Sequence, residues 1–293
     1  MFRVLIADDS ALFRGIVHKG IQVHRDKRYL DINFASDGAE ALKILNQKEI
    51  DIAFIDINMP HLSGPQLVAE LPETRSKNCL VVAISGNMDV KSEAVLQEYG
   101  AYHFMQKPFR AQDAADVFMT YIVMTETYPI LVVDDSATMR KITRKVLEKS
   151  RFSFEIFEAD SARNALKSIL ERRPDLVLTD FHMPDVDGLE LAGSIRSVTN
   201  RIGIYMMSTS DTDHLERSAA FVGITGFLKK PFSAADIDSI MHSRLGLDTP
   251  KFGKTRAMFS FLERDFDISS ELAEESDREE EAEEDCHLEK VLI

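Results

Sequence analysis

The chain of 293 residues has few of the residues and segments on which several protein classes depend. It contains two cysteines, Cys79 and Cys286, far apart in the sequence, which excludes a disulfide framework and a multi-cysteine zinc site. No apolar run reaches the ~18 residues that a membrane span needs, and the N-terminus MFRVLIADDS lacks a secretory signal pattern. We therefore expect a cytoplasmic protein with no membrane partner.

Positively charged residues are also fewer than negatively charged ones. Asp and Glu number 49 against 35 Lys and Arg, which gives a formal net charge of −14 and opposes binding to nucleic-acid phosphates. Residues 248–293 alone hold 15 acidic and 6 basic residues, and a run of like charge buries little apolar surface. We expect this tail to be largely disordered, either as a solvated segment or, through the apolar cluster Met258–Leu262, as one that folds on a basic partner.

The body of the chain contains a repeat of about 125 residues. Three pairs of motifs recur in the same order: VLIADDSALFRGIV with LVVDDSATMRKIT, DIAFIDINMPHLSG with DLVLTDFHMPDVDG, and YHFMQKPF with TGFLKKPF. The offset is 126 residues between Asp9 and Asp135 and 123 residues between Lys107 and Lys230. Chance similarity would not keep this order and spacing, so we predict a duplicated domain, with copies at residues 1–127 and 128–247.

Each copy alternates short apolar runs with longer amphipathic stretches. The runs lack polar alternation, as expected for strands buried on both faces of a parallel sheet. In the first copy, the predicted strands are Val4–Ala7, Ile32–Phe34, Ile52–Ile55, Leu80–Ile84 and Tyr102–Met105. In the second copy, they are Ile130–Val133, Phe154–Phe157, Leu176–Leu178, Ile202–Met207 and Gly226–Leu228.

Helical patterns lie between these runs. The spacing of Met139, Ile142 and Val146 predicts a helix over Ala137–Leu147, with Ser136 as its N-terminal cap. Five strand–helix units per copy predict an α/β fold of two flavodoxin-like, doubly wound (βα)5 domains in tandem. A linker of only a few residues separates the copies, so we expect the domains to be close neighbours.

Charged or hydroxyl-bearing side chains follow the predicted strands, at the sheet edge where doubly wound folds bind ligands. Carboxylates follow the first and third strands of each copy, a hydroxyl follows the fourth, and a lysine follows the fifth. In the first copy these are Asp8, Asp9, Asp56, Ser85 and Lys107, and in the second Asp134, Asp135, Asp180, Ser208 and Lys230.

Three carboxylates in one crevice repel one another, and a hard cation such as Mg²⁺ would neutralise them with oxygen ligands. The lysine and the serine would stabilise the charge of a transferring phosphoryl group. The aspartate after the third strand is the natural nucleophile, because a carboxylate can form an acyl phosphate. No glycine-rich phosphate loop occurs, so we expect a phosphoryl donor other than a nucleotide bound by this chain.

Each copy contains an Asp-Asp pair, Asp-x-x-Met-Pro, a hydroxyl residue and Lys-Pro-Phe. Over residues 1–246, both copies resemble the receiver domains of bacterial two-component response regulators, and LVVDDSATMRKI is especially similar to chemotaxis-type receivers. The resemblance implies that Asp56 and Asp180 accept a phosphoryl group from the phosphohistidine of a histidine kinase or histidine phosphotransfer protein. It implies no enzymatic activity beyond self-phosphorylation and self-dephosphorylation.

The resemblance also implies roles for the other residues. One Mg²⁺ per receiver would be held by Asp9 and Asp135 and by the acceptors, with support from Asp8 and Asp134 and the backbone carbonyls of Asn58 and His182. Ser85 and Ser208 would swing toward the phosphate beside Lys107 and Lys230, while Phe104 and Phe227 rotate inward. That rotation would reshape the partner-binding face of the fourth helix, fifth strand and fifth helix.

Plainer explanations stay open for single residues. Phe104 and Phe227 could be ordinary core residues, His182 an exposed loop residue, and Cys79 a small apolar filler. The position two after the acceptor is Asn58 in one copy and His182 in the other. The resemblance implies that this position tunes dephosphorylation, so we expect the copies to lose phosphate at different rates.

Two hypotheses for the function follow. The first is a phosphorylation-controlled binding module that acts on an unknown downstream protein, with a homodimer as a further candidate. The second is a phosphorelay intermediate or phosphate sink. The residues after 247 are too few and too acidic for a winged-helix DNA-binding domain, and no Gly-Gly-Asp-Glu-Phe motif for cyclic-dinucleotide synthesis occurs. We therefore expect a protein–protein output.

Overall fold

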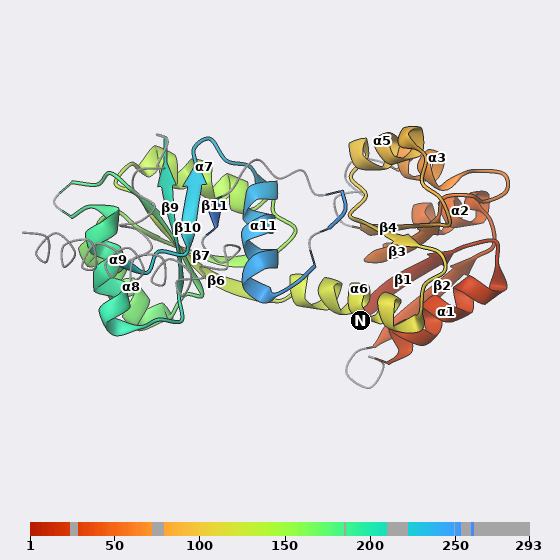
Figure 1. Cartoon of the computed structure of the whole chain (residues 1–293), viewed down its shortest axis with the longest axis horizontal. Helices are drawn as coiled ribbons and strands as arrows, with labels where there is room; N and C mark the ends of the chain where they lie inside the picture. Colours follow the sequence, from red (N-terminus) through yellow and green to blue (C-terminus); the bar gives the residue numbers. More distant parts are fainter. Residues whose placement is uncertain are drawn as a thin grey trace, which may run out of the picture.

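The computed structural model describes residues 1–23, 29–71, 79–184, 186–209, 222–248, 250–252 and, for the backbone, 259–260. These residues form two α/β units joined end to end (Figure 1). The first unit consists of β1 (Phe2–Ala7), α1 (Ala11–Gln22), β2 (Leu30–Ala35), α2 (Gly38–Gln47), β3 (Ile52–Asp56), α3 (Gly64–Ala69), β4 (Leu80–Ser85), α5 (Val90–Glu98), β5 (His103–Gln106) and α6 (Ala111–Met124).

The second unit repeats this order. It consists of β6 (Thr127–Val133), α7 (Ala137–Leu147), β7 (Ser153–Ala159), α8 (Ala162–Arg172), β8 (Leu176–Asp180), α9 (Gly188–Val198), β9 (Gly203–Ser208), β10 (Gly226–Lys229) and α11 (Ala234–Leu245). A short strand, β11 (Phe259–Ser260), comes after α11 in the chain.

The strand orders are those of a doubly wound fold. The first sheet runs β2-β1-β3-β4-β5 with every pair parallel, and the second runs β11-β10-β9-β8-β6-β7. Among the described strands of the second sheet, the β10–β11 pair is antiparallel and the other pairs are parallel. The chain reverses its winding between β1 and β3, and again between β6 and β8, so a crevice opens at the carboxyl ends of these strands. The predicted fold class is confirmed.

Each sheet is buried on both faces, which explains the continuous apolar runs. Val4 and Ile6 of β1 pack into one core cluster with α1 and α6, whereas Leu5 and Ala7 pack into another with α2, α3 and α5. The helix α1 lies so close to α6 that a Cβ on Gly20 would stand 2.2 Å from the carbonyl oxygen of Ala111. Glycine is therefore required at this contact.

The ten predicted strands all exist, with ends that differ by one to three residues, and the helix predicted over Ala137–Leu147 has the same bounds. The Ser136 hydroxyl accepts from the backbone N–H of Met139 at 3.4 Å, as the cap prediction required. In the predicted tail, residues 253–258 and 261–293 lie outside the described residues, as does Cys286. Within the part of the chain that the structure covers, no helix is long and apolar enough to cross a membrane.

The two units share part of their core. Only two residues separate the end of α6 from the start of β6, so β6 begins one residue before the predicted boundary at 128. Phe118 and Ile122 of α6 belong to the same hydrophobic cluster as Ile130 of β6 and Ile240 of α11. The short linker therefore places the units in direct contact.

Candidate functional site

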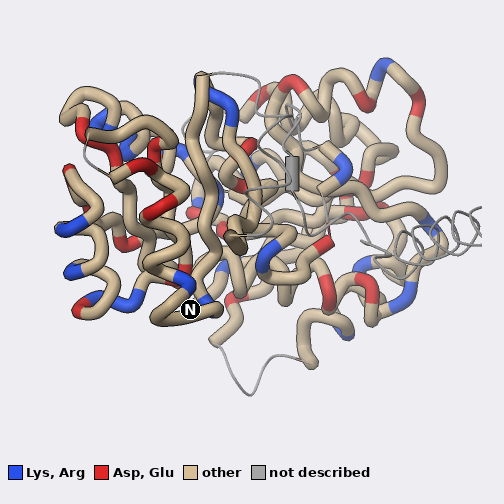
Figure 2. Tube along the Cα trace, turned by 60° about the vertical axis from the view of Figure 1, so that its left-hand side comes forward, with Lys and Arg blue, Asp and Glu red and all other residues tan. Residues whose placement is uncertain are grey.

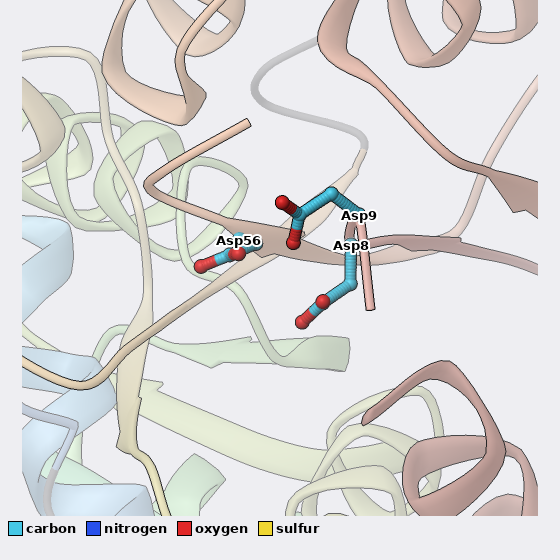
Figure 3. Close-up of side chains that lie close together, drawn as sticks. All are labelled: Asp8, Asp9 and Asp56. Carbon is cyan, nitrogen blue, oxygen red and sulfur yellow. The ribbon is translucent and has the colours of Figure 1, made fainter. Parts of the chain in front are cut away.

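Three carboxylates of the first unit converge at the crevice between β1 and β3. Asp8 and Asp9 directly follow β1, and Asp56 ends β3. One oxygen from each lies within 4.8 Å of the others, and Figure 3 shows the side chains gathered around a common space. Asp8 and Asp56 are 1% and 3% exposed, whereas Asp9 is exposed.

A lysine neutralises part of this charge. Lys107 follows β5, and its Nζ lies 2.8 Å from Oδ2 of Asp8 and 3.0 Å from Oδ2 of Asp56. The backbone N–H of Lys107 donates to the carbonyl of Ser85 at 2.8 Å, so the β4–β5 pairing positions it. A cis peptide bond joins Lys107 to Pro108, and the same holds for Lys230 and Pro231 in the second unit.

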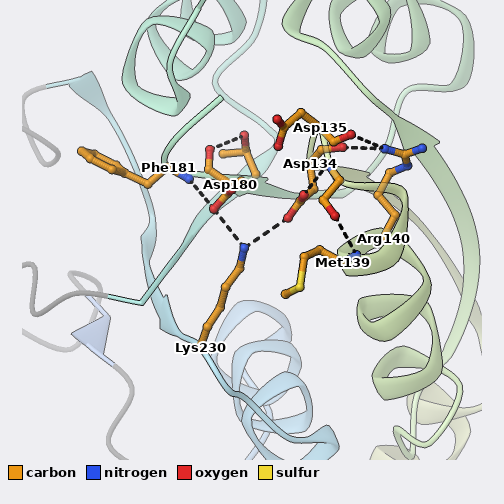
Figure 4. A network of polar contacts seen from close by, with 9 residues as sticks. Asp134, Asp135, Met139, Arg140, Asp180, Phe181 and Lys230 are labelled. Atoms are coloured by element: carbon orange, nitrogen blue, oxygen red, sulfur yellow. Dashed lines mark hydrogen bonds and ion pairs between the residues drawn. The ribbon is translucent and has the colours of Figure 1, made fainter. Parts of the chain in front are cut away.

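The second unit repeats the arrangement (Figure 4). Oxygens of Asp134, Asp135 and Asp180 lie within 4.8 Å of one another. Nζ of Lys230 lies 3.1 Å from Oδ2 of Asp134 and 2.9 Å from Oδ1 of Asp180. The backbone N–H of Phe181 also donates to Asp180 at 3.0 Å. Each unit thus has a complete pocket of three carboxylates and one bridging ammonium group.

The buried carboxylates and the lysine change one another's pKa values. Burial raises the pKa of Asp56, and Asp8 raises it further, while the hydrogen bond from Lys107 lowers it. Burial lowers the pKa of Lys107, but its contacts with Asp8 and Asp56 outweigh that effect, so the pKa is raised overall. The ammonium group therefore stays charged at neutral pH.

The donor set fits a hard divalent cation. Three carboxylates and one ammonium group leave a formal charge of −2 in each pocket, and every candidate ligand atom is oxygen. Mg²⁺ prefers such ligands and keeps several of its waters. Asp9 and Asp135 are the exposed members of the two clusters, so they can contact an ion that enters from solvent.

The serine after the fourth strand is buried in both units. Ser85 is 0% exposed, its hydroxyl donates to the carbonyl of Asn87 at 2.7 Å, and it accepts from the amide of Asn58 at 3.3 Å. Ser208 ends β9 and is 6% exposed. Asn58 thus reaches Ser85 from the loop after Asp56, and its backbone N–H donates to Oδ1 of Asp56 at 3.4 Å, so these three residues form one group.

The other predicted residues lie where the strands predict them. Phe104 of β5 is half-buried and Phe227 of β10 is 3% exposed. His182 is exposed, and its ring packs edge-on against Phe181 at 4.6 Å between centroids. Burial raises the pKa of the Cys79 thiol to about 12, which agrees with an unreactive core residue.

Two residues of the first pocket escaped the sequence analysis. Arg14 of α1 donates through Nη1 to the carbonyl oxygens of Asp8, at 2.6 Å, and Asp9, at 3.2 Å. Nζ of Lys107 lies 4.3 Å from the centroid of the Phe13 ring, within cation–π range. These contacts fix the carboxylate loop and the lysine.

The repeat itself could have revealed the arginine. In the second unit, Arg140 makes the same pair of contacts, to the carbonyl oxygens of Asp134 at 2.7 Å and Asp135 at 3.3 Å. Both arginines stand six residues after the first aspartate of their motif. At the position of Phe13 the second unit has Met139 instead. The arginine contact is thus duplicated, whereas the aromatic contact belongs to the first unit.

Comparison with known proteins agrees with the repeated fold. The sequence model of the family described as "Response regulator receiver domain" matches residues 4–118 and 130–242. "Response regulator MprA" of Mycolicibacterium vanbaalenii is 33% identical over 124 residues, which are 42% of this chain and 53% of that protein. "Chemotaxis protein CheY" of Bacillus subtilis is 33% identical over 105 residues, 36% of this chain and 87% of that protein. The chain thus spans about half the length of the MprA relative.

Solved structures also resemble both units together. One titled "probable two-component system response regulator/GGDEF domain protein" has a TM-score of 0.56 and 25% identity, over 84% of this chain and 98% of that chain. Another, a "putative two-component system response regulator/ggdef domain protein", has a TM-score of 0.55 at 24% identity, which concerns the fold alone.

Proposed function

The chain belongs to the response regulator receiver family, with two receiver domains in tandem, and from this premise we propose that both units accept phosphoryl groups in two-component signalling. The acceptors in this proposal are Asp56 and Asp180, and the donor is the phosphohistidine of a histidine kinase or a histidine phosphotransfer protein. The output is a change in protein–protein binding. A cytoplasmic location and the absence of any enzymatic activity on other molecules belong to the same proposal.

In the proposed step, a carboxylate oxygen of Asp56 or Asp180 forms a P–O bond to phosphorus as the P–N bond of the phosphohistidine breaks. The imidazole leaves with the electron pair of that bond and takes up a proton, and the product is an acyl phosphate. Lys107 and Lys230 already lie within 3.0 Å of the acceptor carboxylates, so each can pair with the developing charge on the phosphoryl oxygens.

A cation would be held by the carboxylates of Asp9 and Asp56 in the first unit and of Asp135 and Asp180 in the second, with Asp8 and Asp134 behind them. Bound Mg²⁺ supplies positive charge to phosphoryl oxygens and reduces the repulsion between carboxylates. Arg14 and Arg140 fix the loop that carries the metal-binding aspartates, through its backbone carbonyls. Backbone carbonyls of Asn58 and His182 remain proposed ligands.

The observation that carries the proposal is the duplicated pocket. In each unit, three carboxylates have oxygens within 4.8 Å of one another, and one lysine bridges two of them. A structural ion pair needs one carboxylate per lysine. A third, exposed carboxylate in both copies supports a site for a cation and a phosphoryl group.

Phosphorylation with acetyl phosphate and Mg²⁺, followed by intact-mass analysis, tests the proposal. We expect two phosphoryl groups on the wild-type chain and one on either Asp56→Ala or Asp180→Ala. Asp116→Ala changes an exposed carboxylate on α6 outside the pocket, and should still take up two. If both acceptor variants took up two groups, the assignment would be wrong.

The alternative of a phosphorelay intermediate or phosphate sink predicts a different outcome. A sink passes or drains phosphate from the kinase without a change in the affinity of any partner. The binding module instead changes its contacts when it is phosphorylated. Phosphotransfer kinetics measured beside pull-down of partners with beryllofluoride-treated protein separates the two.

A further inference from the structure

The strand β5 of the first unit is approached by the second unit. The Tyr102 hydroxyl, directly before β5, lies 2.6 Å from Nε2 of His242 in α11, and both side chains are buried. The Arg151 guanidinium donates to the carbonyl oxygen of Gly100 at 2.9 Å and lies 5.5 Å from the centroid of the Tyr102 ring. The second unit therefore docks on the loop that leads into the strand of Phe104.

The docking residues hold one another in place. Nδ1 of His242 lies 2.6 Å from the carbonyl oxygen of Asp238, so this nitrogen donates and Nε2 accepts from Tyr102. The Asp238 carboxylate accepts from the Ser150 hydroxyl at 2.5 Å and from the backbone N–H of Arg151 at 3.0 Å. Both hydrogen-bonding edges of the imidazole are therefore used, and the docked surface is preorganised.

The chain then returns from α11 to the same strand of the first unit. We call residues 250–252 the return segment. The backbone N–H of Phe252 donates to the carbonyl of Tyr102 at 3.4 Å, and the Phe252 side chain is 6% exposed within a core cluster of the first unit. Nζ of Lys251 lies 4.2 Å from the centroid of the Phe104 ring. The return segment thus sits on the aromatic residue of β5.

The equivalent aromatic of the second unit has different surroundings. Phe104 is half-buried beneath Lys251, whereas Phe227 is 3% exposed within the core of its own unit. Strand β11, which starts seven residues after Phe252, pairs with β10 in the register Phe227 to Phe259. One stretch of chain therefore contacts the fifth strand of both units.

We propose that the return segment is an internal ligand of the first unit, held on β5 by Phe104 and released when Asp56 is phosphorylated. The inference rests on the proposed function and extends it, because it names the first output of the first unit as a segment of its own chain. Partner access to the β5 face then follows from release of the segment.

The release would follow from the inward rotation of Phe104 that the family resemblance implies on phosphorylation of Asp56. A Phe104 ring buried as deeply as Phe227 would no longer lie under Lys251, so the bound segment would lose its cation–π contact. Such a contact at a partly exposed site corresponds to about a two- to fivefold change in an equilibrium. The buried Phe252 side chain and its backbone hydrogen bond to Tyr102 remain, so the loss shifts the open population of the segment by this same factor.

Hydrogen exchange of the full-length chain, followed by mass spectrometry of peptides that contain residues 250–252, tests the inference. We expect exchange in these peptides to rise about two- to fivefold with acetyl phosphate and Mg²⁺. The rise should persist in Asp180→Ala and vanish in Asp56→Ala. Intact mass of the same samples reports how many phosphoryl groups the chain carries.

Two substitutions probe the contact without phosphorylation. Lys251→Ala and Phe104→Leu each remove one side of the cation–π pair, and both should raise exchange in the unphosphorylated chain. Lys141→Ala, an exposed lysine of α7, should leave it unchanged. Phe104→Leu should also reduce the rise in exchange on phosphorylation, because leucine keeps the apolar bulk but lacks the aromatic face.

The outcomes separate the inference from the function on which it rests. If Asp180→Ala gains its phosphoryl group and exchange of the return segment does not change, the inference is wrong and the phosphoryl-acceptor function stands. If Asp180→Ala gains none, the function at Asp56 is wrong and the inference falls with it.

Discussion

In the first unit the proposed acceptor Asp56 has a side chain 5% exposed, and Asn58 reaches across from the next loop to Ser85. In the second unit the side chain of Asp180 is 19% exposed, and the residue at the position of Asn58 is the exposed His182. The lysine bridge is nearly the same in both, with distances from 2.8 to 3.1 Å. The shared lysine bridges thus come from residues at the strand ends, and the differences come from the loop after Asp56 or Asp180.

Figure 2 compares the two units by the distribution of their charged residues. Asp and Glu residues are interspersed with Lys and Arg residues along the traces of both units. Salt screens exposed charges beyond about 10 Å, so differences between the two pockets should arise from neighbouring side chains.

The largest expected effect concerns the metal. Asp9→Asn and Asp135→Asn each remove a charge from the exposed carboxylate of one pocket, so Mg²⁺ affinity of that unit should fall at least about tenfold, a typical loss for changes near a metal. Isothermal titration of each variant should show one weakened site and one unchanged site. Equal affinity in wild type and variants would remove these residues from the metal site.

The next effect concerns the residue before the fifth strand, which is Tyr102 in the first unit and Thr225 in the second. Tyr102→Phe leaves buried Nε2 of His242 without its partner, which should lower the stability of the interface by about 1–3 kcal/mol. The hydroxyl of Thr225, the equivalent residue, accepts from Ile204 within its own unit.

Urea unfolding followed by circular dichroism measures this difference. Tyr102→Phe should separate one joint transition into two, because the contact that it removes lies between the units. Thr225→Val removes a contact within the second unit, so it should lower the midpoint of the joint transition without separating it. A Tyr102→Phe chain that unfolds as the wild type does would show that this hydrogen bond does not couple the units.

A smaller effect is expected in the lifetime of the phosphoryl group. Water reaches Asp180 more readily than Asp56, so the acyl phosphate should hydrolyse faster in the second unit, by about fivefold for a barrier difference of about 1 kcal/mol. Mass spectrometry of quenched, digested samples measures the two sites separately. Asn58→His should shorten the lifetime at Asp56 and narrow the gap. Equal lifetimes in the wild type would contradict the role of exposure.

The smallest effect concerns Phe13. Phe13→Leu removes the ring beside Lys107 and should slow phosphorylation of Asp56 by about two- to fivefold, the value of one cation–π contact of about 0.5–1 kcal/mol. Met139→Leu in the second unit should leave the rate at Asp180 unchanged. Initial rates with acetyl phosphate compare the two. A similar change in both variants would indicate a packing effect on α1 and α7.

The positions of the pocket residues could be predicted because each residue directly follows a strand and because the arrangement occurs in both copies. Buried parallel strands leave apolar runs, and Asp56 or Lys230 needs only to follow such a run to lie at the right sheet edge. The repeat could also have revealed Arg14 and Arg140, since they keep the same spacing in both copies.

The contacts between the units could not be predicted in this way. Tyr102 and His242 are 140 residues apart, and each contact is made once, so neither periodicity nor the repeat marks it. Phe252 stands among Lys and Gly in a stretch with no regular pattern, yet it is 6% exposed against the first unit. Sequence reasoning predicts what a domain repeats, and it cannot predict how the two copies meet.

Strand β11 has a consequence for solubility. The last strand of a sheet offers unpaired N–H and C=O groups to any passing chain, and proteins shield such edges to avoid aggregation. Here β11 pairs with β10 at Gly226 and Phe227, and the backbone of Phe252 hydrogen-bonds beside β5 at Tyr102. A chain truncated directly after α11 would expose both edges at once, so shortened versions of this protein should self-associate more readily than the full-length chain.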